Sequence, residues 1–294
     1  MEIELSAGTI DYQDTGGDGP AVVLLHGLLM DGSLWRHVVA ELRADHRCVV
    51  PTLPLGGHRR PMRPGADLSG RGQARLVAEL LERLALSDVT LVGSDWGGAQ
   101  LVVSEGCDER VGRLVLCAQE AFDNYPPGLP GRAIGLAARV PGGLGAALAP
   151  LVLRPLRRTP LTFGWMSRRP VPDEIMDGWL RPALRQAAIR RDLRRYICTS
   201  DLNDYVRAAE DLRSFTRPAL VVWGTQDRVM PVEHGRRLAA LLSAGRLVEI
   251  DDSYTLISED QPAELAVAIR RFTREAVEAA ERDGARGRVG STPD

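Results

Sequence analysis

One stretch of the chain, Leu-Val-Gly-Ser-Asp-Trp-Gly-Gly from Leu91 to Gly98, constrains the fold more than any other. An apolar, β-branched run leads into it, and Ala99–Val103 continues it with residues of helical type, so it predicts a strand, a sharp turn and a helix. Glycines on both sides of one side chain are what such a strained turn needs, because bulk beside it would clash. Counted from the flanking glycines, the central residue is Asp95 and not a serine. The stretch therefore predicts a carboxylate presented at a tight bend.

Segments of strand and helix character alternate along most of the chain. The continuously apolar run Ala21–Leu25 is typical of a strand that is buried on both faces. The segments with strand character are Ile3–Leu5, Thr9–Gln13, Ala21–Leu25, Arg47–Val50, Val89–Val92, Val111–Cys117, Ala219–Trp223 and Leu247–Ile250. This order predicts the α/β class, with a doubly wound, mostly parallel, eight-stranded sheet and an antiparallel pair at its start. Reactive residues are then expected at the carboxyl ends of the strands.

The texture of the sequence changes between residues 122 and 211, where prolines are frequent and separate short helical patches. We expect this segment to be a helical cap, or lid, inserted after the sixth strand and placed over the cleft. The α/β core is then formed by residues 1–121 and 212–280. The charged, glycine-containing segment 281–294 is expected to be a disordered tail.

The expected cap is rich in arginine. From Leu129 to Arg195 there are 13 arginines and four acids. One interpretation is a solvated helical surface, and the other is a basic lid that draws in an anionic substrate or carrier.

Composition excludes several classes of function. The 294 residues carry a net charge of −2, so no overall field favours nucleic acid. The four cysteines form no C-x-x-C pair and are expected to be buried, reduced thiols of a cytoplasmic protein. The first residues have strand character, not that of a signal peptide, and no 18-residue apolar run exists, so we expect no membrane span. The expected partner is a small-molecule substrate, possibly anionic, and we expect no nucleic acid, no membrane, no cofactor and no metal; the sequence does not predict the oligomeric state.

Further motifs accompany the turn at Asp95. His26-Gly27 follows a buried strand, where a glycine lets backbone N–H groups point into a cleft as an oxyanion hole requires. Gly224-x-x-Asp227-x-x-x-Pro231 follows a later strand, and Glu259-Asp260-Gln261-Pro262 precedes the last helix. With these four motifs in this order, the chain resembles the α/β-hydrolase superfamily over nearly its whole length. The resemblance implies the α/β-hydrolase fold, with Asp95 as nucleophile and Asp227 as the acid.

Asp95-Trp96-Gly97-Gly98 looks most like the epoxide hydrolases and haloalkane dehalogenases of that superfamily. Those enzymes attack carbon with a carboxylate, form an alkyl ester, and hydrolyse it with a histidine-activated water. The segment Glu120 to Pro127 is also similar to a little-characterised bacterial group of α/β-hydrolases.

The chain departs from the family at the general base. The family has a histidine seven residues before the proline of the last motif, and this chain has Thr255 there. A hydroxyl is too weakly acidic to serve as a base near neutral pH, and loss of a general base costs about 10²–10⁴ in rate. Of the remaining histidines, only His58 is a candidate replacement; its other interpretation is an ordinary loop residue. His26 is expected to orient the backbone of the oxyanion loop.

Other positions bear on the substrate. Dehalogenases pair the tryptophan after the nucleophile with a second halide donor; Trp96 is present, but Leu28 has no side-chain N–H, which argues against dehalogenation. Epoxide hydrolases use lid tyrosines to protonate the opening oxygen. Tyr125 is the best placed for this role, although packing against the neighbouring prolines is an equally good interpretation.

Three acids, Asp95, Glu120 and Asp227, are expected to meet near the cleft, where like charges and burial raise at least one pKa. A protonated acid beside a carboxylate could then perform acid/base chemistry without histidine. Without a histidine to orient, Asp227 is either a relic of the fold or a partner of Thr255.

Three functions stay open. The first is epoxide-hydrolase-like hydrolysis of a small organic substrate by a route that lacks the usual histidine. The second is a non-hydrolytic cyclase, isomerase or dehydratase of specialised metabolism, in which Asp95 transfers a proton. The third is a ligand-binding protein without catalysis.

Overall fold

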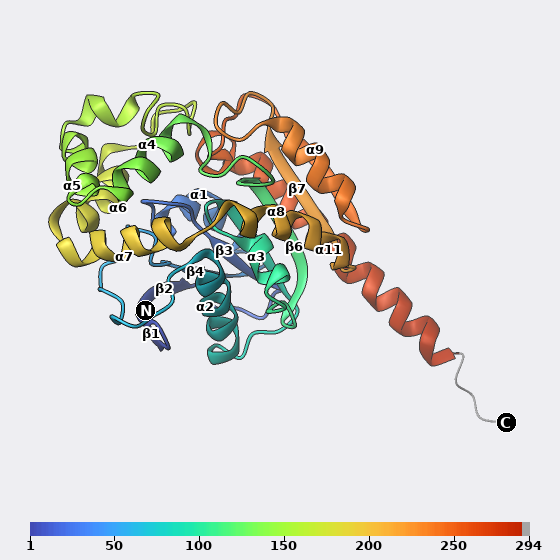
Figure 1. The fold of residues 1–294 in the computed structure, drawn as a ribbon. Helices are drawn as coiled ribbons and strands as arrows, with labels where there is room; N and C mark the ends of the chain where they lie inside the picture. The colour runs from blue at the N-terminus through green and yellow to red at the C-terminus, as the bar shows by residue number, and fades with distance from the viewer. Residues whose placement is uncertain (290–294) are drawn as a thin grey trace.

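A single eight-stranded sheet forms the centre of the protein, in the strand order β1-β2-β4-β3-β5-β6-β7-β8 (Figure 1). The computed structural model describes residues 1–289. β1 and β2, and β2 and β4, are antiparallel, and the other pairs from β4 to β8 are parallel. The strands are β1 Glu2–Leu5, β2 Gly8–Asp14, β3 Ala21–Leu25, β4 Arg47–Pro51, β5 Val89–Asp95, β6 Val111–Gln119, β7 Ala219–Gly224 and β8 Gly245–Ile250. The predicted fold class is confirmed.

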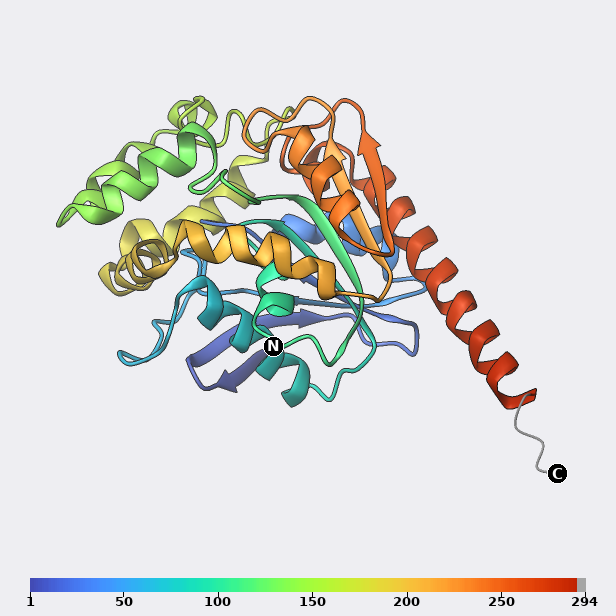
Figure 2. The ribbon, with the colours of Figure 1, turned by 45° about the vertical axis from the view of Figure 1, so that its right-hand side comes forward.

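Helices cover both faces of this sheet. α1 and α11 pack together on one face, whereas α2, α3, α8 and α9 lie along the other (Figures 1 and 2). The α-helices are α1 Arg36–Leu42, α2 Gly70–Arg83, α3 Ala99–Ser104, α4 Gly128–Arg139, α5 Gly143–Leu148, α6 Asp173–Arg185, α7 Ala187–Thr199, α8 Leu202–Asp211, α9 Val232–Leu241, α10 Ile257–Asp260 and α11 Pro262–Val289. The 3₁₀ helices are η1 Gly32–Trp35, η2 Ala149–Val152, η3 Arg154–Arg158 and η4 Leu212–Ser214.

The segment expected as the cap contains α4 to α8 with η2 and η3. α4, α5 and α6 project beyond one end of the sheet (Figure 2), whereas α8 packs against α3 on the sheet. The part of the insertion that stands away from the core therefore ends before α8, whereas the cap was expected to extend to residue 211.

The end of the chain differs from the expected tail. α11 continues through Val289, so residues 281–289 are helical, and residues 290–294 lie outside the described residues.

The burial of the cysteines is less uniform than expected. Cys48 and Cys117 are buried, Cys107 is half-buried and Cys198 is exposed, and all four are free thiols. In residues 1–289, no helix is long and apolar enough to cross a membrane.

Candidate active site

Asp95 lies at the carboxyl end of β5, in the left-handed backbone conformation with a φ of 51°. The close approach of neighbouring backbone explains why glycine surrounds it. A Cβ atom at Gly27 would lie 2.0 Å from Oδ2 of Asp95, and one at Gly93 would lie 2.6 Å from Cβ of Ala99. Any larger side chain at either position would displace the carboxylate or separate β5 from α3. The tight bend that the sequence predicts is therefore present.

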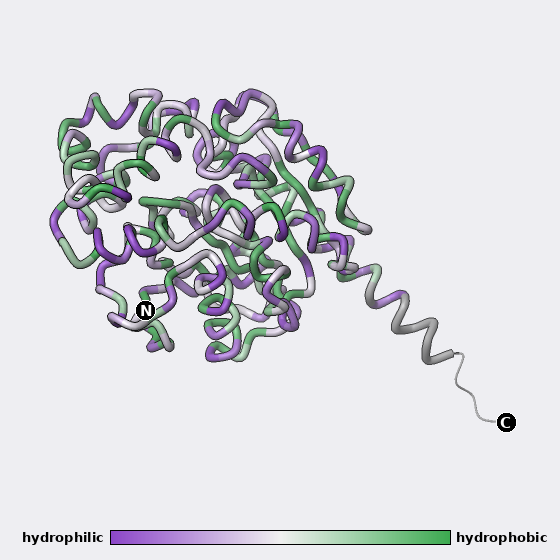
Figure 3. Tube along the Cα trace, viewed as in Figure 1, coloured by the Kyte–Doolittle hydropathy of each residue, from purple (hydrophilic) through white to green (hydrophobic). Residues whose placement is uncertain are grey.

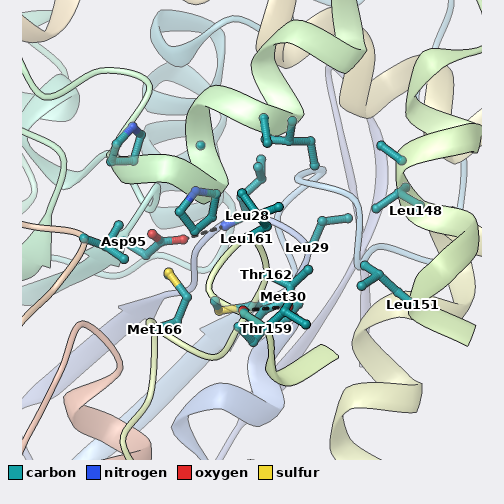
Figure 4. A pocket seen from close by; sticks show the side chains of 18 of the residues that line it. Leu28, Leu29, Met30, Asp95, Leu148, Leu151, Thr159, Leu161, Thr162 and Met166 are labelled. Atoms are coloured by element: carbon teal, nitrogen blue, oxygen red, sulfur yellow. Dashed lines mark hydrogen bonds between the residues drawn. The ribbon is translucent and has the colours of Figure 1, made fainter. Parts of the chain in front are cut away.

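The two oxygens of Asp95 have different surroundings. The backbone N–H of Leu28 donates to Oδ2 at 3.0 Å (Figure 4). No group among the described residues donates a hydrogen bond to Oδ1, which is buried. One oxygen is thus held by a backbone donor and the other has no partner.

His26 holds the loop that supplies the Leu28 donor. Its Nε2 accepts a hydrogen bond from the N–H of Leu53 at 2.8 Å, so Nδ1 carries the proton and donates to the carbonyl of Gly27 at 2.8 Å. Burial lowers the pKa of His26 to about 4, and the ring is neutral near pH 7. His26 orients the backbone, as expected, and is not free to serve as a base.

Asp227 and Thr255 contact each other. The Thr255 hydroxyl donates to Oδ1 of Asp227 at 2.7 Å, and that oxygen also accepts from the N–H groups of Val229 and Met230. Oδ2 of Asp227 has no partner among residues 1–289. Of the two alternatives for Asp227, a relic or a partner of Thr255, the structure shows the partner.

No histidine faces Asp95 within the described residues. The candidate replacement, His58, is buried away from it: Nδ1 accepts from the N–H of Gly56 at 3.2 Å, and Nε2 lies 3.4 Å from Oδ2 of Asp192 in α7. This pairing ties the loop after β4 to the cap, so the structure does not support His58 as a replacement base.

Met166, a cap residue, lies next to the loop of Thr255. Its carbonyl accepts from the N–H of Leu256 at 2.7 Å, and its side chain lines the same cavity as Asp95 (Figure 4). The thioether of Met166 therefore shares the cavity with Asp95, and a thioether cannot accept a proton near neutral pH.

Burial raises the pKa values of all three acids. Desolvation is the largest cause in each: it raises the pKa of Asp95 to about 7 and that of Asp227 to about 7. The pKa of Glu120 is raised well above its usual value, first by burial and then by the charge of Asp95. Neither carboxyl oxygen of Glu120 has a hydrogen-bond partner among the described residues, and burial and the charge of Asp95 both favour the protonated form of this carboxyl.

These shifts predict that stability falls as pH rises. Unfolded carboxyls titrate near pH 4, so between about pH 4 and pH 7 the folded state binds more protons than the unfolded state. Each raised pKa therefore lowers the free energy of unfolding through this window, by an amount on the order of a few kcal/mol per group.

Asp227→Asn tests this dependence on pH, because the asparagine keeps an oxygen acceptor for the three donors of Asp227. We expect a smaller loss of stability from about pH 5 to about pH 8 in this variant than in the wild type, measured by urea unfolding. An equal loss of unfolding free energy in the variant and the wild type would contradict the raised pKa of Asp227.

The cavity beside Asp95 has a volume of about 460 Å³ and is almost entirely apolar. Its core walls are Leu28, Leu29, Met30, Asp95, Trp96 and Val229, and its remaining walls come from cap residues between Pro127 and Met166. Thr159 and Thr162 are the other polar residues of the lining, and their hydroxyls bond the backbone of their own loop. No arginine lines this cavity, so its chemistry favours a neutral, apolar ligand rather than the anionic one that the cap sequence suggested.

Tyr125 does not reach this cavity. Its ring stacks on Tyr205 with centroids 4.2 Å apart and lies 5.2 Å from Trp96, and it is absent from the lining. The hydroxyl of Tyr125 has no hydrogen-bond partner among the described residues, and burial raises its pKa. Tyr125 therefore packs against aromatic rings, whereas the second interpretation expected it to pack against the neighbouring prolines. Trp96 lines the cavity, and Leu28 beside it offers no side-chain donor for a halide.

Asp260 has a structural role that the sequence motif alone did not reveal. Its Oδ1 accepts from the Ser167 hydroxyl and the N–H of Arg169, and its Oδ2 accepts from the N–H groups of Arg168 and Tyr254, all between 2.8 and 3.0 Å. This buried carboxylate therefore joins the cap to the loop that carries Thr255.

We expect Asp260→Asn to lower the free energy of unfolding by about 2–4 kcal/mol, because the amide NH₂ would face N–H donors inside the protein. Urea unfolding measures this. Asp252→Asn is the matched control, since Asp252 pairs with Arg168 and Arg169 at the surface, where exposed ion pairs contribute less than about 1 kcal/mol. Equal losses of unfolding free energy in the two variants would show that the hydrogen bonds of Asp260 do not hold the cap to the loop of Thr255.

Comparisons with known proteins agree with this fold. The model of the Alpha/beta hydrolase family matches residues 22–268. A cis-3-alkyl-4-alkyloxetan-2-one decarboxylase of Xanthomonas campestris pv. campestris is 28% identical over 284 residues, covering 90% of this chain and 91% of the relative. Haloalkane dehalogenase 2 of Mycobacterium bovis is 27% identical over 284 residues, with coverage of 90% and 91%. The solved structure of an ancestral haloalkane dehalogenase is similar with a TM-score of 0.74 at 20% identity, covering 95% of this chain and 99% of that one.

Proposed function

The chain belongs to the alpha/beta hydrolase family, and on that premise we propose that it is an enzyme whose Asp95 carboxylate opens the strained oxygen ring of an apolar substrate. The observation that supports this most directly is the asymmetry of Asp95. The backbone N–H of Leu28 holds Oδ2, while Oδ1 has no partner among the described residues and belongs to a side chain that lines the cavity. A carboxylate fixed in this way is oriented for attack on carbon.

The favoured substrate class is a dialkyl β-lactone (oxetan-2-one). Oδ1 attacks the ring carbon that carries the ring oxygen, that C–O bond breaks, and the opened ring becomes a carboxylate joined to Asp95 by an ester. The carboxylate then leaves as CO₂; its C–C electron pair becomes the alkene bond, and the ester C–O bond breaks to restore Asp95. No water and no proton enters this sequence.

Two features of the site favour that route. The leaving group of the first step is a carboxylate, which needs no proton, and no proton donor other than the Trp96 indole and the two bonded threonines lines the cavity. The second step needs no activated water, and Thr255 stands where the family has its base. The relative from Xanthomonas campestris pv. campestris, named as a decarboxylase of such lactones, supports the same substrate class.

Epoxide opening is the second candidate, supported by the same nucleophile. Oδ1 would attack a ring carbon, and the released alkoxide would take a proton from water. The resulting ester would have to be hydrolysed without a histidine, so an epoxide is expected to alkylate Asp95 and to turn over slowly.

The test compares a cis-dialkyl oxetan-2-one with an epoxide of the same chain length, both in ¹⁸O-labelled water. We expect the lactone to give the cis-alkene and CO₂, because inversion at the attacked carbon places the ester C–O bond opposite the departing carboxylate. We expect the epoxide to add its own mass to the peptide that contains Asp95. Conversion of the lactone to a labelled hydroxy acid would show ordinary hydrolysis instead. Binding of both compounds without product or adduct would indicate a ligand-binding protein.

A further inference from the structure

The outer surface of the cap carries most of the exposed apolar residues of the protein. Of twelve large apolar side chains that are exposed among the described residues, seven lie between residues 129 and 161. They are Leu129, Leu136, Val140, Val152, Leu153, Leu156 and Leu161. Figures 1 and 2 show α4 and α5, which include or flank several of them, on the side of the molecule away from the sheet. Apolar residues gathered on one exposed segment are typical of an interaction surface.

α4 combines this apolar character with positive charge. Leu129, Arg132, Leu136 and Arg139 are all exposed and follow one another at spacings of three, four and three residues, so they form one stripe along the helix. Gly131 and Ile134 of the same helix line the cavity beside Asp95. One helix therefore forms a wall of the candidate active site and also presents a mixed leucine and arginine stripe to solvent. Figure 3 shows the matching alternation of hydrophobic and hydrophilic residues along the cap.

A second hollow lies at the same end of the cap, between α5, η3 and α6, with a volume of about 640 Å³. Five arginines line it: Arg154, Arg157, Arg181, Arg185 and Arg190. Its only acidic lining residue is Asp177, which already contacts Arg157 at 2.7 Å. The hollow therefore has an excess of positive charge, and Val152 and Leu184 at its edge are apolar. A guanidinium group can donate two hydrogen bonds to two oxygens of the same phosphate. Arginines in a hollow are therefore suited to the phosphate of a phospholipid headgroup.

We propose that this outer surface of the cap, the α4 stripe together with Val152, Leu153 and the arginine-lined hollow, docks onto an anionic phospholipid membrane. Charge complementarity identifies the partner: residues 129–195 hold 13 arginines and four acids, whereas the whole chain has a net charge of −2. An apolar face flanked by arginines binds at the interface of such a membrane without a spanning helix.

Exposed cap residues also form part of the cavity wall. Leu156 and Leu161 are exposed and also line the cavity beside Asp95. Docking therefore places an apolar cavity against an apolar phase, and a substrate dissolved in the bilayer enters without crossing water. Docking does not depend on the chemistry at Asp95, so the two proposals fail separately.

The test is co-sedimentation of the full chain with vesicles of phosphatidylcholine, with or without phosphatidylglycerol, at low and high salt. We expect binding only when phosphatidylglycerol is present, and weaker binding at high salt. Arg132→Glu with Arg139→Glu is expected to lower the partition coefficient at least about tenfold. Leu136→Ser with Leu153→Ser is also expected to lower it, because these residues lose their apolar contact with the bilayer. The matched control changes two exposed arginines and one exposed apolar residue elsewhere, Arg43→Glu, Arg59→Glu and Val267→Ser, and is expected to bind as the wild type does.

Three results would overturn the proposal. The first is no binding to phosphatidylglycerol vesicles by the wild type. The second is equal loss of binding in the cap variants and the control. The third is a wild-type dimer that becomes monomeric with Leu136→Ser and Leu153→Ser while vesicles stay unbound, which would assign the face to a second copy of the chain. Turnover of a short, water-soluble substrate by the cap variants would confirm that the active site is intact in each case.

Discussion

Asp95→Asn is expected to reduce alkene formation from a β-lactone by at least about a thousandfold, because an amide oxygen is a poor nucleophile. The amide can keep the Leu28 N–H bond, so the shape of the turn is preserved. Alkene is measured by gas chromatography, and the epoxide adduct by mass spectrometry of the intact protein; both should disappear.

The same substitution is expected to stabilise the protein above about pH 7, since it removes a buried carboxyl whose pKa is raised to about 7. A loss of activity with a gain of stability separates a missing nucleophile from a damaged fold. Full activity of Asp95→Asn would contradict the proposed attack by the Asp95 carboxylate, whatever ligand the cavity binds.

Thr255→His is expected to convert the epoxide from an alkylating agent into a substrate. The side chain at this position already bonds Asp227, so an imidazole here would have its orienting acid in place. We expect breakdown of the Asp95 ester to accelerate by about 10²–10⁴, the usual contribution of a general base. Quenched-flow mass spectrometry of the alkylated protein measures this rate. Alkene formation from the lactone should not require the histidine.

Thr255 is fully buried, so the larger ring needs space. The companion variant Thr255→His with Met166→Ala provides it, because Met166 lies between this loop and the cavity. Thr255→Val, which removes only the hydroxyl, is the control for loss of the Asp227 contact. Rapid epoxide hydrolysis by the wild type, unchanged by the histidine, would show that another group activates water.

The sequence predicts the parts of this protein that depend on local backbone requirements. The glycines around Asp95 and at Gly27 are needed by the turn itself, and the continuous apolar strands can be buried only between helices, so the fold and the turn that presents Asp95 could be inferred before the structure. The spacing of Thr255 from Pro262 places a threonine where the resemblance implies a histidine.

The walls of the site could not be predicted in this way. Met166 and Leu161 reach the cavity through turns of the cap that have no regular period, and Tyr125 is turned into an aromatic cluster with Tyr205. The arginines suggested an anionic ligand at Asp95, but they line a separate hollow and the outer surface. Asp260 looked like part of a family motif, and only its four donors show what it holds.

The bonds of Asp260 also determine where the cap can open. Lifting the segment from Ser167 to Arg169 would break three hydrogen bonds to Asp260 inside the protein, so that edge acts as a fixed hinge. A movement of the cap that admits a larger substrate must therefore come from the opposite edge, where α4 and α5 meet solvent. Substitutions there should change the chain length of the substrates that the cavity accepts, while Asp95 and its backbone donor stay in place.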